Sequence, residues 1–213
     1  MPVFKFYPLE CLKIDDISFN EDQIAVTPCL LMLKFILPII FFLITGCHGA
    51  EQKNLVLLDF ESDSELDKVK WKCHTLFRLS NENATHGSKS LKFEFYPSAY
   101  PGFSPVLETS DWINYDDLSF DVYNPETKKI EIVVRIDDRE DAPGYTDRYN
   151  RSFSLSLGLN RISIPFDTLI TSGAGRKLDL KTIQALVIFM VDPLEKVTLY
   201  VDYIRLDSDN AGR

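Results

Sequence analysis

Alternation of apolar and polar side chains with a period of two residues is the feature that most restricts the fold of this chain. In the stretch LKFEFY, Leu91, Phe93 and Phe95 share one face of an extended backbone, and the charged residues between them share the other. The same alternation recurs in the stretches 118–124, 129–138, 152–157, 160–165, 186–191 and 197–206. Successive side chains of a β-strand point to opposite faces, so this pattern predicts half-buried antiparallel strands.

Short turns between these runs complete the prediction of an all-β fold. We expect hairpin turns at 124–127 and 157–160, where Asn, Pro and Gly separate two apolar runs. The stretch 62–71 is compatible with one short helical turn, and the stretch 178–186 with a short helix or a loop. With no long helical pattern and many strands, the sequence predicts one antiparallel β-sandwich.

The N-terminal part of the sequence is typical of a targeting signal. The stretch MLKFILPIIFFLITGC (32–47) has one lysine and an apolar run that is too short to span a bilayer comfortably. Its end resembles the lipobox of bacterial lipoproteins, which implies acylation of Cys47. An uncleaved anchor or an ordinary secretory signal is the alternative. The predicted organisation is an N-terminal extension upstream of the true start (1–31), a lipoprotein signal peptide (32–46), a short tether (47–54), the β-sandwich (55–207) and a disordered tail (208–213).

This organisation predicts a protein of the bacterial cell envelope, held at a membrane by its lipid anchor and facing the periplasm or the cell surface. Apart from Cys47, the lipidated chain would retain one thiol, Cys73, which excludes a disulfide framework. The formal charge is −9 and the isoelectric point is near 4.8. Without a basic stripe to neutralise phosphates, nucleic acid is excluded as the main partner, and neutral ligands or cations fit better.

One stretch, RIDDREDAPGYTDRYNRSF (135–153), departs from plain alternation because charged residues and tyrosines crowd into it. Sugar-binding sandwiches stack aromatic rings on pyranose rings and bind hydroxyls with Asp, Asn and Arg. From this stretch and the loop 96–105 we predict a ligand-binding set: Tyr100, Asp137, Asp138, Arg139, Tyr145, Arg148, Tyr149 and Asn150. A structural alternative is that Arg148 pairs with Asp137 or Asp138 across a hairpin.

Three motifs in order along the chain carry a resemblance to a known family. They are DFE (59–61), HGSKSLKFEF (86–95) and LYVDYIRL (199–206). The chain resembles the galactose-binding-like jelly rolls, which include many carbohydrate-binding modules and the complex I intermediate-associated protein domain. The resemblance covers nearly all of the predicted sandwich and implies a jelly-roll fold.

The same resemblance implies a structural Ca²⁺ that joins the first and last strands. Its ligands would be Asp59, Glu61 and Asp202, with backbone oxygens near Ser88 and Lys89. Carboxylate and carbonyl oxygens are the ligands that Ca²⁺ prefers, and a carboxylate within an apolar strand is costly unless it is paired. Alternatively, Asp202 caps a turn or pairs with a cation such as Lys89.

These observations predict a membrane-anchored, non-catalytic lipoprotein that binds a glycan or polysaccharide. No catalytic motif of a known class is present, and the few histidines do not form a constellation with a nucleophile. A structural or assembly lipoprotein that binds a protein partner of the envelope is one alternative. A polysaccharide-active hydrolase or lyase is the other.

Overall fold

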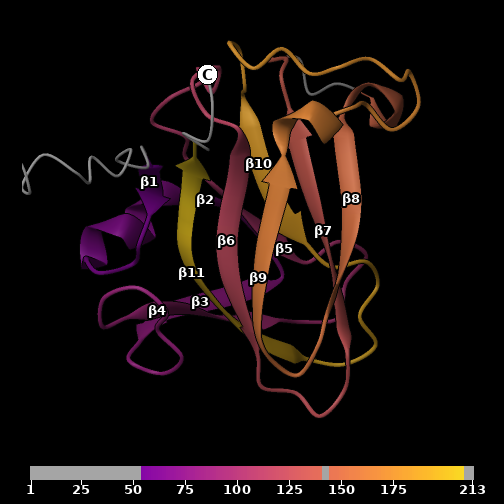
Figure 1. Cartoon of the computed structure of the whole chain (residues 1–213). Coiled ribbons are helices and arrows are strands. Elements are labelled where there is room, and N and C mark those ends of the chain that lie inside the picture. The colour runs from indigo at the N-terminus through magenta and orange to yellow at the C-terminus, as the bar shows by residue number, and fades with distance from the viewer. Residues whose placement is uncertain (1–53, 141–143, 209–213) are drawn as a thin grey trace, which may run out of the picture. The chain divides into compact units, whose positions relative to one another are not determined.

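A computed structural model describes residues 54–140 and 144–208, which form two antiparallel β-sheets (Figure 1). In the six-stranded sheet the order is β3-β4-β11-β6-β9, and β1 also pairs with β11. Its strands are β1 (Asn54–Leu58), β3 (Thr75–Ser80), β4 (Ser90–Phe95), β6 (Asp117–Asn124), β9 (Gly158–Pro165) and β11 (Val197–Asp207). In the five-stranded sheet the order is β2-β5-β10-β7-β8. Its strands are β2 (Val69–Cys73), β5 (Gly102–Pro105), β7 (Ile130–Asp137), β8 (Tyr149–Leu155) and β10 (Ala185–Phe189).

The alternation of the sequence sets which side chains lie between the two sheets. Phe93 of β4 stacks on Phe103 of β5 with 4.0 Å between the ring centroids, so the core joins one sheet to the other. The inward-facing apolar positions of β4, β6 and β7 are at most 5% exposed: Leu91, Phe93, Phe95, Leu118, Phe120, Val122, Ile130, Ile132, Val134 and Ile136. The predicted antiparallel β-sandwich is confirmed.

The predicted turns at 124–127 and 157–160 exist but are not hairpins. Each connects strands of different sheets, because β6 and β9 belong to the six-stranded sheet and β7 and β8 to the five-stranded one. A strand buries the same alternating face whether its neighbour in sequence lies beside it or across the core, so alternation cannot distinguish the two arrangements. Among the described strands, consecutive strands pair within one sheet at β3–β4 and at β7–β8.

Three short 3₁₀ helices connect the strands: η1 (Asp63–Lys68), η2 (Tyr145–Asp147) and η3 (Phe166–Thr168). The first is the helical turn predicted within 62–71, and the side chain of Ser62 caps it by accepting from the amide of Ser64. The stretch 178–184 is a loop that leads into β10. Within the described ranges no helix is long and apolar enough to cross a membrane. The predicted extension, signal peptide, acylation site Cys47 and most of the tether and tail lie outside the described residues.

Candidate ligand-binding face

The outer face of the five-stranded sheet gathers half of the residues that the sequence suggested for ligand binding. We call it the ligand face and define it by Tyr100, Ser104, Val133, Arg135, Asp137, Arg148, Asn150, Val187 and Phe189. Strand register places Val187 of β10, Arg135 of β7 and Asn150 of β8 side by side in one row. The inward neighbours of these residues lie in the core, so alternation turns this row away from the core.

One end of the ligand face is apolar. Tyr100 is 57% exposed, and its ring meets the ring of Phe189 edge-on with 6.0 Å between centroids. Gly102 of β5 lies directly opposite Phe189, and a Cβ atom at Gly102 would come within 2.4 Å of the Phe189 Cβ. The glycine therefore leaves room for the phenylalanine between neighbouring strands. Together with Val187, these rings form a surface suited to the apolar side of a sugar ring.

The other end of the ligand face is polar and rigidly held. The Arg135 Nε donates to Asp137 Oδ1 at 2.9 Å, and its Nη2 donates to Asp137 Oδ2. Asp137 is 3% exposed although it lies on the outer side of the sheet. The Asn150 side chain lies close to Ser172, whose hydroxyl accepts from the Asn150 backbone amide at 3.1 Å. The polar groups thus stand in fixed positions beside the apolar end.

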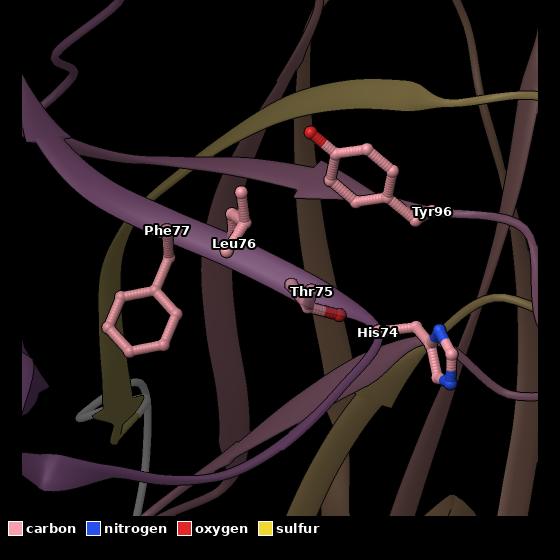
Figure 2. Close-up of a pocket in the computed structure, with 5 residues that line it drawn as sticks. All are labelled: His74, Thr75, Leu76, Phe77 and Tyr96. Atoms are coloured by element: carbon pink, nitrogen blue, oxygen red, sulfur yellow. The ribbon is translucent and has the colours of Figure 1, made fainter.

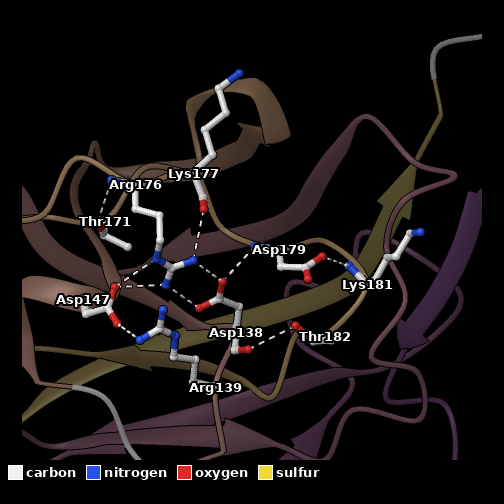
Figure 3. Close-up of polar contacts among 9 residues, drawn as sticks. All are labelled: Asp138, Arg139, Asp147, Thr171, Arg176, Lys177, Asp179, Lys181 and Thr182. Carbon is white, nitrogen blue, oxygen red and sulfur yellow. Dashed lines mark hydrogen bonds and ion pairs between the residues drawn. The ribbon is translucent and has the colours of Figure 1, made fainter.

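An ion-pair network is built around the buried carboxylate of Asp138, the residue that follows Asp137 (Figure 3). Arg176 donates from Nη1 and Nη2 to the two oxygens of Asp138, at 2.6 and 2.9 Å, and from Nε to Asp147 at 3.0 Å. The amide of Asp179 also donates to Asp138, at 2.7 Å. Burial raises the pKa of Asp138, but the bonds from Arg176 and Asp179 outweigh it and leave the pKa lowered. The network ties the β7–β8 loop to the segment 171–182, and we call it the Arg176 latch.

The structure gives three predicted ligand-binding residues other roles. Asp138 belongs to the Arg176 latch, with a side chain that is 1% exposed. Arg139 pairs with Asp147 at 2.6 Å at the edge of the latch. Tyr149 faces the core, because the odd-numbered positions of β8 point inward. Burial raises the pKa of its hydroxyl group.

The remaining predicted residues lie on or beside the ligand face. Tyr100, Asp137, Arg148 and Asn150 are part of it, and Tyr145 of η2 borders it with 65% of its surface exposed. The expected cross-hairpin pair between Arg148 and Asp137 or Asp138 does not form, because other arginines hold both carboxylates.

Sequence reasoning missed Arg135, Val187, Phe189 and Arg176. Arg135 stands two residues before Asp137 in an alternating strand, and this spacing was the signal that both share a face. Val187 and Phe189 lie in LVIFMV (186–191), an entirely apolar run that does not show which side chains point outward. Arg176 comes from a segment far from Asp138 in sequence, so no local pattern could join them.

The groups predicted to bind Ca²⁺ are occupied by hydrogen-bond donors of the chain itself. The Asp202 Oδ2 accepts from the amides of Thr85 and His86, at 2.7 and 3.0 Å. The Glu61 carboxylate accepts from the amides of Ser88 and Lys89, at 2.8 and 2.7 Å, which lowers the pKa of Glu61.

Two further contacts complete this arrangement. The Lys89 ammonium donates to the Glu61 carbonyl at 3.2 Å, and Asp59 accepts from the Glu61 amide at 3.3 Å. Within the described part of the chain, no cluster of three or more His, Cys, Asp or Glu side chains is placed to hold a metal. Amide and ammonium donors point at the oxygens that a cation would need, so these residues do not fit Ca²⁺ in this arrangement.

A second candidate site is an open pocket of about 690 Å³ beside β3 (Figure 2). It is lined by His74, Thr75, Leu76, Phe77 and Tyr96. Leu76 and Phe77 point to opposite sides of the strand in the close-up, so the pocket wraps around a sheet edge. Its lining is mostly apolar, and none of the predicted ligand-binding residues reaches it. We therefore favour the ligand face, where apolar and polar groups lie side by side.

Comparison with solved structures identifies the fold. A family 11 carbohydrate-binding module from Clostridium thermocellum, in complex with a β-1,3-1,4-mixed-linked tetrasaccharide, matches with a TM-score of 0.58 and 18% identity. The match covers 72% of this chain and 94% of that chain. An exo-β-agarase matches with a TM-score of 0.60 and 17% identity, over 72% of this chain and 25% of that chain.

A third similar structure is the N-terminal part of a Clostridium thermocellum endo-1,4-β-D-xylanase, complexed with xylohexaose. It matches with a TM-score of 0.51 and 15% identity, over 76% of this chain and 29% of that chain. Comparison with protein-family models and with curated proteins gives no match. The predicted jelly-roll β-sandwich, of the kind found in carbohydrate-binding modules, is confirmed as the fold of this chain.

Proposed function

We propose that this protein binds carbohydrate on the ligand face. The observation that carries the proposal is the juxtaposition of an aromatic surface, Tyr100 and Phe189, with fixed polar groups, Arg135 and Asn150, on one outer sheet face. Aromatic rings stack on the apolar side of a pyranose ring, while guanidinium and amide groups bind its hydroxyls. Solved structures that match this fold over all or part of their length include a module in complex with a β-1,3-1,4-mixed-linked tetrasaccharide and a xylanase fragment complexed with xylohexaose, which supports this class of ligand.

Binding without catalysis is part of the proposal. Glycoside hydrolases need two carboxyl groups, about 5 to 9.5 Å apart, free to act as acid and as base or nucleophile. On the ligand face two nitrogens of Arg135 hold Asp137, and in the Arg176 latch Arg176 holds Asp138 and Asp147. Carboxylates fixed in ion pairs are poorly placed to exchange protons with a substrate.

We further propose that acylation at Cys47 keeps the binding domain at a membrane of the bacterial envelope. The support is the signal-like stretch that ends at this cysteine. A lipid-anchored binder would retain its glycan close to the cell.

Affinity gel electrophoresis with dissolved mixed-linkage β-glucan, xylan and agarose tests the proposed function. We expect at least one polysaccharide to retard the chain, and Tyr100→Ala or Phe189→Ala to weaken binding about tenfold, because each removes an aromatic ring that would be buried against the sugar. Tyr96→Ala is the matched control, since it removes a tyrosine from the pocket beside β3. Loss of binding in Tyr96→Ala, but not in Tyr100→Ala or Phe189→Ala, would indicate that the sugar binds in the pocket beside β3.

Two other outcomes would favour the rival functions. If no polysaccharide retards the chain and an envelope protein co-purifies with it, a structural or assembly role replaces carbohydrate binding. Release of new reducing ends from a polysaccharide would show hydrolysis, and release of unsaturated products would show a lyase. Each of these contradicts non-catalytic carbohydrate binding.

A further inference from the structure

Arg148 is a half-buried cation that forms no ion pair of its own in the described part of the chain, because Arg135 binds the neighbouring Asp137. It directly precedes β8 with an extended backbone, at φ −138° and ψ 153°. Its side chain therefore lies on the same side of the sheet as Asn150, two residues on. The Nε atom is buried and has no hydrogen-bond partner among the described residues. No ion pair joins its guanidinium to a described carboxylate either, whereas buried charges are normally paired.

The charges around Arg148 explain why it lacks a partner. Its electrostatic neighbours are Arg135, Asp137 and Tyr145, so two guanidinium groups share one carboxylate. Arg135 already binds both oxygens of that carboxylate. Burial, followed by the charge of Arg135, lowers the pKa of Arg148, which means that the cation is held where its charge is disfavoured.

The acidic residues of the neighbouring loop do not relieve this excess of positive charge. Asp138 binds Arg176, and Asp147 binds both Arg176 and Arg139. These carboxylates belong to the Arg176 latch. Within the described residues, the polar end of the ligand face therefore carries one uncompensated positive charge.

We propose that Arg148 binds an anionic substituent of the glycan, a uronate carboxylate or a sulfate ester, and that the protein prefers acidic over neutral polysaccharides. The inference rests on the carbohydrate binding proposed above. A guanidinium group donates two parallel hydrogen bonds to either anion. The ring of Tyr145 lies 5.8 Å from the Arg148 guanidinium carbon and is exposed, so it can contact the sugar that carries the anion.

The net charge of −9 does not oppose this binding at physiological salt. Electrostatic interactions between exposed charges are screened over about 8 Å at an ionic strength of about 0.15 M. Distant carboxylates on the rest of the surface are therefore largely screened, whereas a half-buried guanidinium in direct contact with an anion is screened much less.

Two matched pairs of polysaccharides test the inference on the full chain, kept in a mild non-ionic detergent. Polygalacturonate and highly methyl-esterified pectin share a backbone but differ in carboxylate charge, and chemically sulfated agarose and agarose share a backbone but differ in sulfate. We expect the charged member of one pair to bind at least about tenfold more tightly than its neutral member, as for hydrogen bonds to a charged group. The pair that shows this preference identifies the anion.

Variants at two neighbouring arginines assign the preference to one side chain. Arg148→Gln should abolish the preference, and Arg148→Lys should retain part of it, because lysine keeps the charge but not the paired donors. Arg151→Gln is the matched control, since Arg151 lies on the same strand, opposite the inward-facing Val134, and covers the ring of Phe153. Its removal should leave the preference unchanged.

The outcomes separate this inference from the proposed function. Equal binding of charged and neutral members overturns the anion site and leaves carbohydrate binding standing, whereas no binding to any polysaccharide overturns both. Arg148→Gln should not lower the melting temperature, because it removes an uncompensated charge. A fall of several degrees in the melting temperature of Arg148→Gln would show that Arg148 has a structural partner and would contradict the proposal. A matching fall in Asp141→Asn would identify that partner as Asp141, which lies outside the described residues.

Discussion

Among single residues, Glu65 is a carboxyl group that the fold holds in an unfavourable place. It lies in η1 with 8% of its surface exposed, and its Oε2 atom is buried without a hydrogen-bond partner among the described residues. Burial, followed by the charge of Asp59, raises its pKa above the ordinary value of 4.5. A carboxyl group whose pKa is raised by folding stabilises the fold while protonated. That stabilisation is fully present at pH values below the ordinary carboxyl pKa of 4.5, and it is lost as the pH rises through the folded-state pKa of Glu65.

We predict that Glu65→Gln raises the free energy of unfolding at pH 7 by about 1 kcal/mol, because the amide removes a buried charge that is paired with the Lys68 ammonium only at 3.9 Å. The gain should shrink on acidification toward the ordinary carboxyl pKa, where Glu65 itself becomes protonated. Urea denaturation across this pH range measures both effects. Glu108→Gln is the control, since this exposed carboxylate binds Lys68 at 2.8 Å and should give no gain. A loss of stability in Glu65→Gln at pH 7 would instead show that the ion pair with Lys68 outweighs the cost of burying the carboxylate.

Within single elements, the Arg176 latch fixes the loop that presents Tyr145 and Arg148. We predict that Arg176→Met lowers the free energy of unfolding by about 3 to 5 kcal/mol, because it leaves the buried carboxylate of Asp138 without a counterion. The lowered pKa of Asp138 means that the latch stabilises the fold above the ordinary carboxyl pKa, 3.8, and that this stability is lost as the pH falls through the folded-state value. Urea denaturation near neutral pH and under acid conditions measures the loss.

Two further variants show whether the latch acts through Asp138. The double variant Asp138→Leu with Arg176→Met should recover part of the lost stability, because it removes both buried charges together. Arg139→Gln should cost less than about 1 kcal/mol, since Arg139 is 56% exposed and pairs with Asp147 at the surface. Equal losses in Arg176→Met and Arg139→Gln would contradict a buried latch.

The loop between β3 and β4 is the element on which the predicted Ca²⁺ depends. Because Glu61 and Asp202 already accept amide donors from this loop, we predict that a chelator leaves the melting temperature unchanged. Asp202→Ala should lower stability by about 2 kcal/mol even with chelator present, because the part-buried amides of Thr85 and His86 lose their acceptor. A melting temperature that rises with added Ca²⁺ in the parent, but not in Asp202→Ala, would restore the predicted metal.

At the scale of the whole molecule, the sequence predicted the position of side chains best where one face of a strand is buried and the other is exposed to solvent. Phe93 and Ile132 could be placed in the core from alternation alone, because burial of a side chain repeats every second residue. The arrangement of strands into sheets could not be predicted in this way. Turns 124–127 and 157–160 look like hairpin turns in sequence, yet each crosses the core.

Prediction of the ligand face was partial for a related physical reason. Tyr145 and Arg148 were predicted to contact a ligand because charged and aromatic residues are concentrated in one loop. Asp138 lies in the same charged loop, but its carboxylate is ion-paired with Arg176, which comes from a distant segment of the sequence. Local sequence shows which chemistry a loop contains, whereas only the tertiary contacts decide which of its charges remain free to meet a ligand.

The proposed lipid anchor makes a prediction for the whole protein in its cell. Acylation at Cys47 would add a hydrocarbon chain whose burial contributes about 0.8 kcal/mol per methylene, so the protein should partition into the detergent-rich phase of a cloud-point separation and sediment with membranes. Cys47→Ser should abolish incorporation of a labelled fatty acid and move the protein toward the aqueous phase. Cys73→Ser is the matched control, because Cys73 lies half-buried in the sandwich and should leave both readouts unchanged. Membrane association that persists in Cys47→Ser without fatty-acid label would indicate an uncleaved apolar anchor at 35–44 in place of the lipid.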